Sequence, residues 1–539
     1  MTKSTKSVKI RGPDSKNKNS GNGYCPKCGS TWVIKHAMTT NAGSEKQRYE
    51  CKSCKHRTTS PLKKPLVVPD PIRSTLPKAK RYIITAAQNA TPIHKAFWQS
   101  VVRCAEYYNA EIVVIPGRYK NPTSQWTQEN QKHDWWDPAV VPYLCQGTIQ
   151  LNDRLVILGN VKVQWASRKP LVGLDALTKD MSGIIGHGSR GLRSIATPQH
   201  KHPKLMFTTG ACTVANYTDT KAGALGEFNH CLGALIVEID APHGNAFYVR
   251  QLDATREGSF IDLDVEFTPN KVRHAKPALS LTLGDLHQRW VLPQVVEATF
   301  TAPESLTKLT DPRYLFWHDV LDFHSRNHHH DDDWVTRYGK WKFGIECVRT
   351  EMDEAVHFLN KFTPKNRQSI VVSSNHDRAA LKWIKKADFK DDPVNAEFYL
   401  ECAQRLVESA HKTGGGVAYD DPFVSYAKTI ANKNVYFLNA GESKSLLRVE
   451  YSFHGDKGPN GSRGSTQNLS KMGVKVTKAH NHVAEIIDAC YSVGKSTGML
   501  EYEVGAPSAH TNSHALQYAN GKRTIVTIIN GRYCLKRPK

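Results

Sequence analysis

Short apolar runs, each followed closely by polar residues, recur through the second half of the chain. Four such runs cover residues 278–283, 314–317, 370–373 and 446–451. Their length and apolar character predict buried β-strands. In open α/β sheets, ligands bind beyond the carboxyl ends of the strands. The sequence therefore predicts that the polar residues following these runs gather at one edge of a sheet.

The preceding region, residues 81–275, has an α/β pattern. Strands are expected over residues 81–85 and 111–117, with a helix over residues 93–108 between them, which together predict a βαβ unit. Further strands are expected around residues 155–163, 204–209, 234–239 and 246–251. The region is interpreted either as an independent α/β domain or as an extension of the sheet formed by residues 276–539.

The first 80 residues differ in composition. Residues 1–22 are rich in Lys, Ser, Asn and Gly, which predicts a disordered basic arm. Residues 61–80 combine prolines with lysines and predict a semi-rigid linker. Residues 23–60, between them, are interpreted as a small folded unit.

Two Cys-x2-Cys pairs mark that small unit, and 22 residues separate them. Their spacing fits a structural zinc site with four thiolate ligands, Cys25, Cys28, Cys51 and Cys54. Short strands are expected between the pairs, so we predict a zinc ribbon. The segment resembles the zinc ribbons of transposase-associated DNA-binding modules. The alternative is a set of buried or disulfide-paired cysteines.

Composition limits the expected number of domains, the kind of partner and the cellular compartment. At 539 residues, with 39% hydrophobic residues, the chain is long enough for more than one domain. A formal net charge of +23 indicates a polyanionic partner; the alternative, a solvated basic surface, fits less well beside the zinc ribbon. No run of eighteen apolar residues and no secretory signal is present, so neither a membrane span nor secretion is expected. Thiolate chemistry favours a reducing cytoplasm.

The polar residues after the apolar runs are of the types that bind metals. In chain order they are Asp285, His287, Asp319, Asn375, His454, His480 and His482. Carboxylate, imidazole and amide donors suit manganese, iron or zinc, and a site with two metals is suited to phosphoester cleavage. His376, beside Asn375, could protonate the leaving oxygen. Any one of these residues alone is more simply read as part of a solvated loop.

The complete series resembles the signature of the calcineurin-like metallophosphoesterases: GDxH, GDxxD, GNHD/E, a lone His, then GHxH. Within that superfamily it resembles most closely the pre-early host-DNA-degrading nucleases of T-five-like coliphages. The resemblance covers residues 276–539. It implies a metallophosphoesterase-type β-sandwich flanked by helices, preceded by the α/β region of uncertain fold and the zinc ribbon.

The resemblance also implies roles for individual residues. One metal would be held by Asp285, His287, Asp319 and His482, and the other by Asp319, Asn375, His454 and His480. His376 takes the general-acid position, and Asp377 is expected to orient it. The chain departs from the signature at His318, Ser374 and Ala479, each in place of glycine.

Three basic residues are candidates for phosphate contact. Arg326 and His328 follow the second motif closely. Arg463 lies in a Gly-rich loop, residues 458–465, after His454; this loop either tracks a nucleic-acid backbone or is a long turn.

Together these features predict a metal-dependent deoxyribonuclease that uses a hydroxide activated by two divalent ions, with manganese favoured. One structural zinc, a DNA partner and the cytoplasm of an infected host are expected, as for a phage enzyme that degrades host DNA. Related nucleases are often oligomers, so a homo-oligomer fits the resemblance. The alternatives are a phosphatase or small-molecule phosphodiesterase, and a non-catalytic DNA-binding protein on the same fold.

Overall fold

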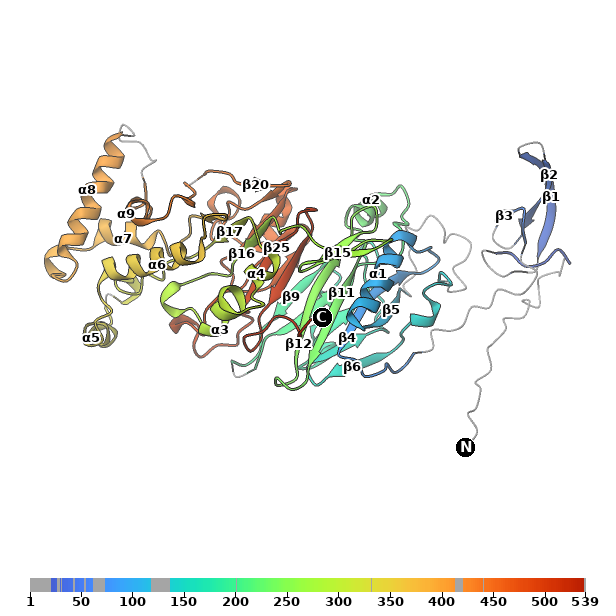
Figure 1. Ribbon diagram of the computed structural model, residues 1–539, viewed down its shortest axis with the longest axis horizontal. Coiled ribbons are helices and arrows are strands. Elements are labelled where there is room, and N and C mark those ends of the chain that lie inside the picture. Colours follow the sequence, from blue (N-terminus) through green and yellow to red (C-terminus); the bar gives the residue numbers. More distant parts are fainter. Residues whose placement is uncertain are drawn as a thin grey trace.

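The computed structural model is drawn in Figure 1. It describes residues 21–26, 30, 32–41, 44–52, 55–61, 73–117, 136–199, 201–330, 332–412, 420–439 and 441–537. Residues 1–20 of the predicted basic arm and residues 62–72 of the predicted linker lie outside these residues. No described helix is long and apolar enough to cross a membrane.

The N-terminal unit is a three-stranded antiparallel sheet that stands apart from the remaining sheets (Figure 1). Its strands are β1 (Val33–Asn41), β2 (Ser44–Cys51) and β3 (Arg57–Thr58). Cys25 and Cys51 are buried in one small cluster with Val33. Cys28 and Cys54 lie outside the described residues, so the zinc site stays a prediction.

A four-stranded sheet follows, with strand order β12-β11-β4-β5. Its strands are β4 (Arg81–Gln88), β5 (Glu111–Gly117), β11 (Gly233–Asp240) and β12 (Ala246–Asp253). Strands β4 and β5 are parallel, and α1 (Lys95–Tyr108) connects them, which confirms the predicted βαβ unit. One face packs on α1 and on the small sheet of β13 (Phe260–Asp262), β14 (Val265–Phe267) and β15 (Val272–His274).

The other face of this sheet packs on a ten-stranded sheet to which both halves of the chain contribute. The earlier half provides β6 (Thr148–Asn152), β7 (Leu155–Leu158), β8 (Ser182–Ile185), β9 (Leu192–Ile195) and β10 (Lys204–Thr208). The later half provides β20 (Ser445–Leu446), β21 (Val449–Glu450), β22 (Lys475–Lys478), β23 (Glu485–Ile487) and β24 (Cys490–Ser492). Leu192 of β9 pairs with Ile486 of β23 where the two sets meet. Residues 81–275 therefore share a sheet with residues 276–539.

A six-stranded sheet carries the first three groups of predicted metal ligands. Its order is β19-β18-β17-β16-β25-β26. The strands are β16 (Ser280–Thr282), β17 (Tyr314–Trp317), β18 (Gln368–Val371), β19 (Val435–Phe437), β25 (Ser513–Gln517) and β26 (Arg523–Thr527). Strands β16 to β19 are parallel to one another, and β25 and β26 complete the sheet in antiparallel fashion.

Helices cover one face of the six-stranded sheet (Figure 1). The helices between residues 293 and 430 are α3 (Pro293–Val296), α4 (Leu306–Thr310), α5 (Trp334–Lys342), α6 (Val348–Phe362), α7 (Ala379–Lys386), α8 (Ala396–Lys412) and α9 (Pro422–Ile430). Leu315 and Val371 point into this helical layer, whereas Phe316 and Ile370 point to the opposite face and pack on Tyr451. This alternation is the two-residue period of a strand that is buried on both faces. The protein is thus a mixed α/β protein, as predicted.

One predicted strand is divided in two. Residues 446–451 form the end of β20 and all of β21, which pair antiparallel across a tight turn. Leu447 and Arg448 form the turn with φ angles of 47° and 63°. The run contains no Gly or Asn, the residues that usually mark a turn with left-handed backbone, so the turn could not be predicted from the sequence.

Candidate metal centre

The carboxyl ends of three adjacent parallel strands bring the first ligand candidates together. Asp285, Asp319 and Asn375 follow β16, β17 and β18 by two to four residues each. The strands are hydrogen-bonded in that order, so their ends share one edge. The prediction that polar residues gather at one edge is confirmed for the first three runs, whereas the fourth run, before His454, lies in the ten-stranded sheet.

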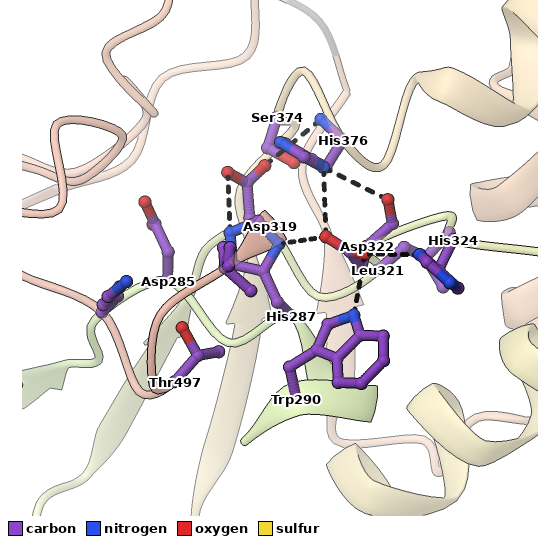
Figure 2. A network of polar contacts seen from close by, with 12 residues as sticks. Asp285, His287, Trp290, Asp319, Leu321, Asp322, His324, Ser374, His376 and Thr497 are labelled. Carbon is purple, nitrogen blue, oxygen red and sulfur yellow. Dashed lines mark hydrogen bonds and ion pairs between the residues drawn. The ribbon is translucent and has the colours of Figure 1, made fainter. Parts of the chain in front are cut away.

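The first cluster consists of Asp285, His287, Asp319 and His482, all buried. Nε2 of His482 lies 3.1 Å from Oδ2 of Asp285 and 3.4 Å from Nε2 of His287. Nε2 of His287 lies 3.8 Å from Oδ2 of Asp319. Figure 2 shows Asp285 and His287 on either side of Asp319. Two imidazole nitrogens and two carboxylates therefore converge on a small volume.

The second cluster shares Asp319 and adds His454 and His480. Nε2 of His454 lies 3.2 Å from Oδ2 of Asp319 and 2.9 Å from Oδ1 of Asn375. The backbone N–H of His480 donates to Oδ2 of Asp285 over 2.9 Å, which ties the two clusters together. Asp319 thus lies between two sets of donors.

These donors fit divalent metal ions. Nitrogen and oxygen ligands of one ion bind at about 2.0–2.2 Å, which places neighbouring donors roughly 3–3.5 Å apart, as they are here. The Oδ1 atom of Asp285 is buried and has no hydrogen-bond partner, although buried polar atoms almost always have one. Buried His and Asp clusters in this protein could therefore hold metal ions.

Without metal, the candidate ligands differ in charge, and an ion at His482 would have to displace a proton. Burial opposes ionisation of Asp285, but the hydrogen bond from His482 and the charges of His454 and His482 together lower the pKa of Asp285 to about 2. Burial likewise opposes charge on His482, but its bonds to Asp285 and Glu503 raise its pKa to about 9. Burial lowers the pKa of His480 to about 4, so that imidazole is neutral and free to bind a metal.

Four of the candidate ligands adopt left-handed backbone conformations. The φ angles are 40° at His287, 42° at Asp319, 77° at His480 and 59° at His482. Non-glycine residues rarely adopt such angles, and those that do cluster at functional sites. Local hydrogen bonds hold the conformation, including one of 2.7 Å from the N–H of His287 to the carbonyl of Asp319.

His376 is held at the edge of the centre by Asp322. Its Nδ1 lies 3.2 Å from the carbonyl oxygen of Asp322 and 3.7 Å from Oδ1 of the same residue. The carboxylate of Asp322 also bonds His287 Nδ1 at 3.1 Å and Trp290 Nε1 at 2.9 Å (Figure 2). The sequence analysis assigned no role to Asp322, although it is the second aspartate of the GDxxD pattern.

The structure corrects the expected role of Asp377. Its Oδ1 accepts a hydrogen bond of 2.9 Å from the N–H of Leu321, and its Oδ2 has no partner. Burial, together with the nearby charge of Asp319, raises the pKa of Asp377 to about 6. Because its carboxylate points to the backbone after β17, Asp377 supports the loop that carries Asp319 and Asp322 rather than the ring of His376.

Glu503 is a second residue that the sequence analysis missed. Its Oε1 lies 3.0 Å from Nδ1 of His482 and 3.0 Å from Nδ1 of His510, and its Oε2 pairs with Lys495. A carboxylate on the second nitrogen of a ligand histidine fixes the ring and its tautomer. No motif marks Glu503, because it reaches His482 from a separate loop.

The three departures from glycine are accommodated without left-handed backbone. None of His318, Ser374 and Ala479 has a positive φ angle. His318 is fully buried beside His454, and burial lowers its pKa to about 3. Ser374 accepts a hydrogen bond from the N–H of Asp377.

A cavity of about 1400 Å³ opens over the centre; we call it the catalytic cavity, after the function proposed below. Asp319, His376, His480 and His482 line it, and so does Arg463, as expected for a phosphate contact. Arg326 does not line it, because its guanidinium pairs with Asp392 and Glu346. His328 is exposed outside the cavity, whereas its neighbours His329 and His330 line it.

The fold and the site together define a class: a mixed α/β protein with a buried Asp/His centre that could hold metal ions. The chain is 33% identical over 473 residues to Protein A1 of Escherichia phage T5, an alignment that covers 85% of this chain and 83% of that protein. The chain therefore belongs to the family of Protein A1 of phage T5. No family model matches the chain, and no solved structure matches it.

Proposed function

We propose that the protein is a metal-dependent deoxyribonuclease of the calcineurin-like metallophosphoesterase type. The observation that carries the proposal is the pair of buried donor clusters that share Asp319 beside a large cavity. Two divalent ions at such a site would acidify a water into a nucleophile and offset the charge of the phosphate. The mixed Asp, His and Asn donors favour manganese.

The protein's own residues supply the remaining parts of the reaction. Asp319 sets the spacing of the two donor sets, and Asn375 and His454 complete the second. The N–H at Nδ1 of His376 donates to the carbonyl of Asp322. When the ring also carries a proton on Nε2, it can give that proton to the leaving oxygen. Arg463, on the wall of the cavity, contacts the phosphate backbone.

DNA is the proposed substrate for reasons of charge and size. The chain carries a formal charge of +23, and a cavity of about 1400 Å³ exceeds the 300–1000 Å³ usual for small-molecule sites. The N-terminal sheet, with Cys25 and Cys51 buried together, supports a structural zinc completed by Cys28 and Cys54. The relative in Escherichia phage T5, together with the resemblance of the motifs, supports a role in degrading host DNA in the cytoplasm of an infected cell.

The test offers the purified protein, with and without Mn²⁺, three substrates: supercoiled plasmid DNA, bis-p-nitrophenyl phosphate and p-nitrophenyl phosphate. We expect Mn²⁺-dependent cleavage of the plasmid, weaker hydrolysis of the diester and little of the monoester. The order of nicked, linear and short products distinguishes endonuclease from exonuclease action. Preference for the monoester would show that the protein is a phosphatase rather than a nuclease. DNA binding without hydrolysis would show that it is a non-catalytic DNA-binding protein.

A further inference from the structure

A second cavity, of about 840 Å³, lies outside the catalytic cavity and is strongly basic. Seven Lys and Arg side chains line it, against two carboxylates, and we call it the basic cleft. Both carboxylates are already paired, Asp253 with Arg190 and Asp488 with Arg168. The other five cations have no carboxylate partner among the described residues: Arg256, Lys471, Lys475, Lys522 and Arg523.

The cations of the basic cleft come from separate parts of the chain and lie close together. Arg256 follows β12, Lys471 and Lys475 flank the start of β22, and Lys522 and Arg523 lie at the start of β26. Burial, together with the charges of Arg523, Lys522 and Arg448, lowers the pKa of Lys475. Like charges held this close repel one another, so an anion in the cleft would relieve the repulsion.

Arg523 forms the floor of the cleft. Its guanidinium donates to the carbonyl oxygens of Val476, at 2.6 Å, and Ala489, at 2.7 Å, and lies 3.9 Å from the centre of the Tyr491 ring. Carbonyls and an aromatic face hold the group in place but leave its charge without a counterion. The cleft is therefore preorganised to accept negative charge.

One segment borders both cavities. Arg463, Gly464, Ser465 and Asn468 line the catalytic cavity, and Ser470, Lys471, Gly473 and Lys475 line the basic cleft. The two sets meet at α10 (Thr466–Leu469): Asn468 in this helix lines the first cavity, and Ser470 directly after it lines the second. A four-residue helix is about 6 Å long, whereas duplex DNA carries a charge roughly every 1.7 Å along its axis. A duplex at the catalytic cavity is therefore long enough to reach the basic cleft.

We propose that the basic cleft binds the sugar-phosphate backbone of the DNA substrate several nucleotides away from the scissile phosphate. This inference rests on the proposed function and extends it to a second contact that anchors a long substrate. Such contacts strengthen binding irrespective of sequence and make it depend on salt. A small diester occupies the catalytic cavity alone and gains nothing from the cleft.

The test compares two triple variants with the parental full-length protein. In the first, Lys471→Gln, Lys475→Gln and Lys522→Gln remove three charges of the cleft. The matched control, Lys361→Gln, Lys365→Gln and Lys433→Gln, removes three exposed charges; the last two lie before the amino ends of β18 and β19, at the opposite edge of the sheet. Thermal unfolding of each variant establishes that the fold is kept.

DNA affinity is measured by fluorescence anisotropy over a salt series with Ca²⁺ in place of Mn²⁺. For the cleft variant we expect the slope of log K against log salt to become shallower by roughly 2–3, at about 0.9 for each lost phosphate contact. The control should change the slope by less than about 1, and both variants should hydrolyse bis-p-nitrophenyl phosphate as the parental protein does. Equal slopes for the cleft variant and the control would overturn the proposal.

Two further outcomes separate this inference from the proposed function. If no protein hydrolyses the diester or DNA, the nuclease assignment fails, while the salt slopes still decide whether the cleft binds DNA. If the cleft variant loses affinity for dAMP but not for DNA, the cleft is a nucleotide pocket and the anchoring proposal is wrong.

Discussion

At the scale of single residues, a variant of His376 distinguishes a metal ligand from a proton donor. Its ring contacts Asp322 and stacks edge-on to His287, with centroids 4.6 Å apart, but it belongs to neither cluster that contains Asp319. We expect His376→Ala to retain its metals and to lose about 10²–10⁴-fold in the rate of DNA cleavage. The loss should be smaller for bis-p-nitrophenyl phosphate, because nitrophenolate leaves without protonation.

Elemental analysis of metal content decides this assignment alongside the kinetics. If His376→Ala contains almost no metal, the histidine is a ligand and its role as acid is wrong. Asp322→Asn is the companion variant: it keeps the backbone carbonyl that holds His376 but weakens the carboxylate contact to His287, so it should lower metal affinity and, with it, the rate.

The buried ring of His187 makes the stability of the fold depend on pH. It is fully buried, accepts a 2.9 Å bond from the N–H of Ser189 and bonds the carbonyl of Gln164. Burial lowers its pKa from 6.5 to about 4, so the folded protein keeps it neutral while the unfolded chain takes up a proton. Stability from this residue is present above pH 6.5 and is lost as the pH falls towards 4.

Replacement of His187 should therefore flatten the acid side of the stability profile. Between pH 6.5 and pH 5, the free energy of unfolding should fall by about 2 kcal/mol more in the parental protein than in His187→Asn, at roughly 1.4 kcal/mol per pH unit. Unfolding midpoints measured across this range check the slope. The exposed His274→Asn serves as control. A slope for His187→Asn as steep as that of the parental protein would contradict the argument.

At the scale of elements, the loop that carries Glu503 supports the metal centre from outside. The carboxylate fixes His482, and Lys495 and the N–H of Leu500 hold the carboxylate in turn. We expect Glu503→Gln to fold but to bind metal about 10–100-fold more weakly, since such supporting contacts typically contribute that much. Titration with Mn²⁺ followed by calorimetry measures the effect, and raised Mn²⁺ should restore the rate.

Glu501→Gln is a suitable control for Glu503, because the side chain of Glu501 is 61% exposed and lies outside the two clusters that share Asp319. Unchanged metal affinity in Glu503→Gln, or loss that excess Mn²⁺ does not restore, would exclude the positioning role.

The elements also show what the sequence could and could not predict. Short, mostly apolar runs before Asp285, Asp319 and Asn375 predicted β16, β17 and β18, because such strands are buried on both faces. Asp322 and Glu503 contact ligand histidines that are distant in sequence. The spacing of residues within a motif does not indicate such contacts between loops. Asp377 was misassigned for the same reason: it is next to His376 in sequence, but its carboxylate accepts a hydrogen bond from the N–H of Leu321.

At the scale of the whole molecule, the sheets connect residues 81–275 to the metal centre, while the N-terminal sheet contributes none of the candidate ligands. A truncated chain should begin at Arg73 rather than later, because Arg73 pairs with Glu111 and its carbonyl accepts from Gln146. We expect it to hydrolyse bis-p-nitrophenyl phosphate at the parental rate. It should bind DNA more weakly and with a shallower salt dependence, since fewer phosphates are neutralised.

Affinity across a salt series, measured for the truncated and full-length proteins side by side, tests this division of roles. If the two proteins have identical affinities and salt slopes, the N-terminal unit does not bind DNA, and contacts with another protein become its expected role. Loss of diester hydrolysis in a folded truncated chain would instead make that unit part of the catalytic assembly.

The central claim is that Asp319 joins two metal sites into one hydrolytic centre. Its carboxylate lies within 3.2 Å of His454 and 3.8 Å of His287, one in each cluster. The most direct measurement is the metal content and Mn²⁺-dependent plasmid cleavage of Asp319→Asn, with its fold checked by circular dichroism. The account predicts a folded protein that has lost most of its bound metal and at least about 10³-fold of its activity. A folded Asp319→Asn protein that cleaves DNA at nearly the parental rate would contradict it.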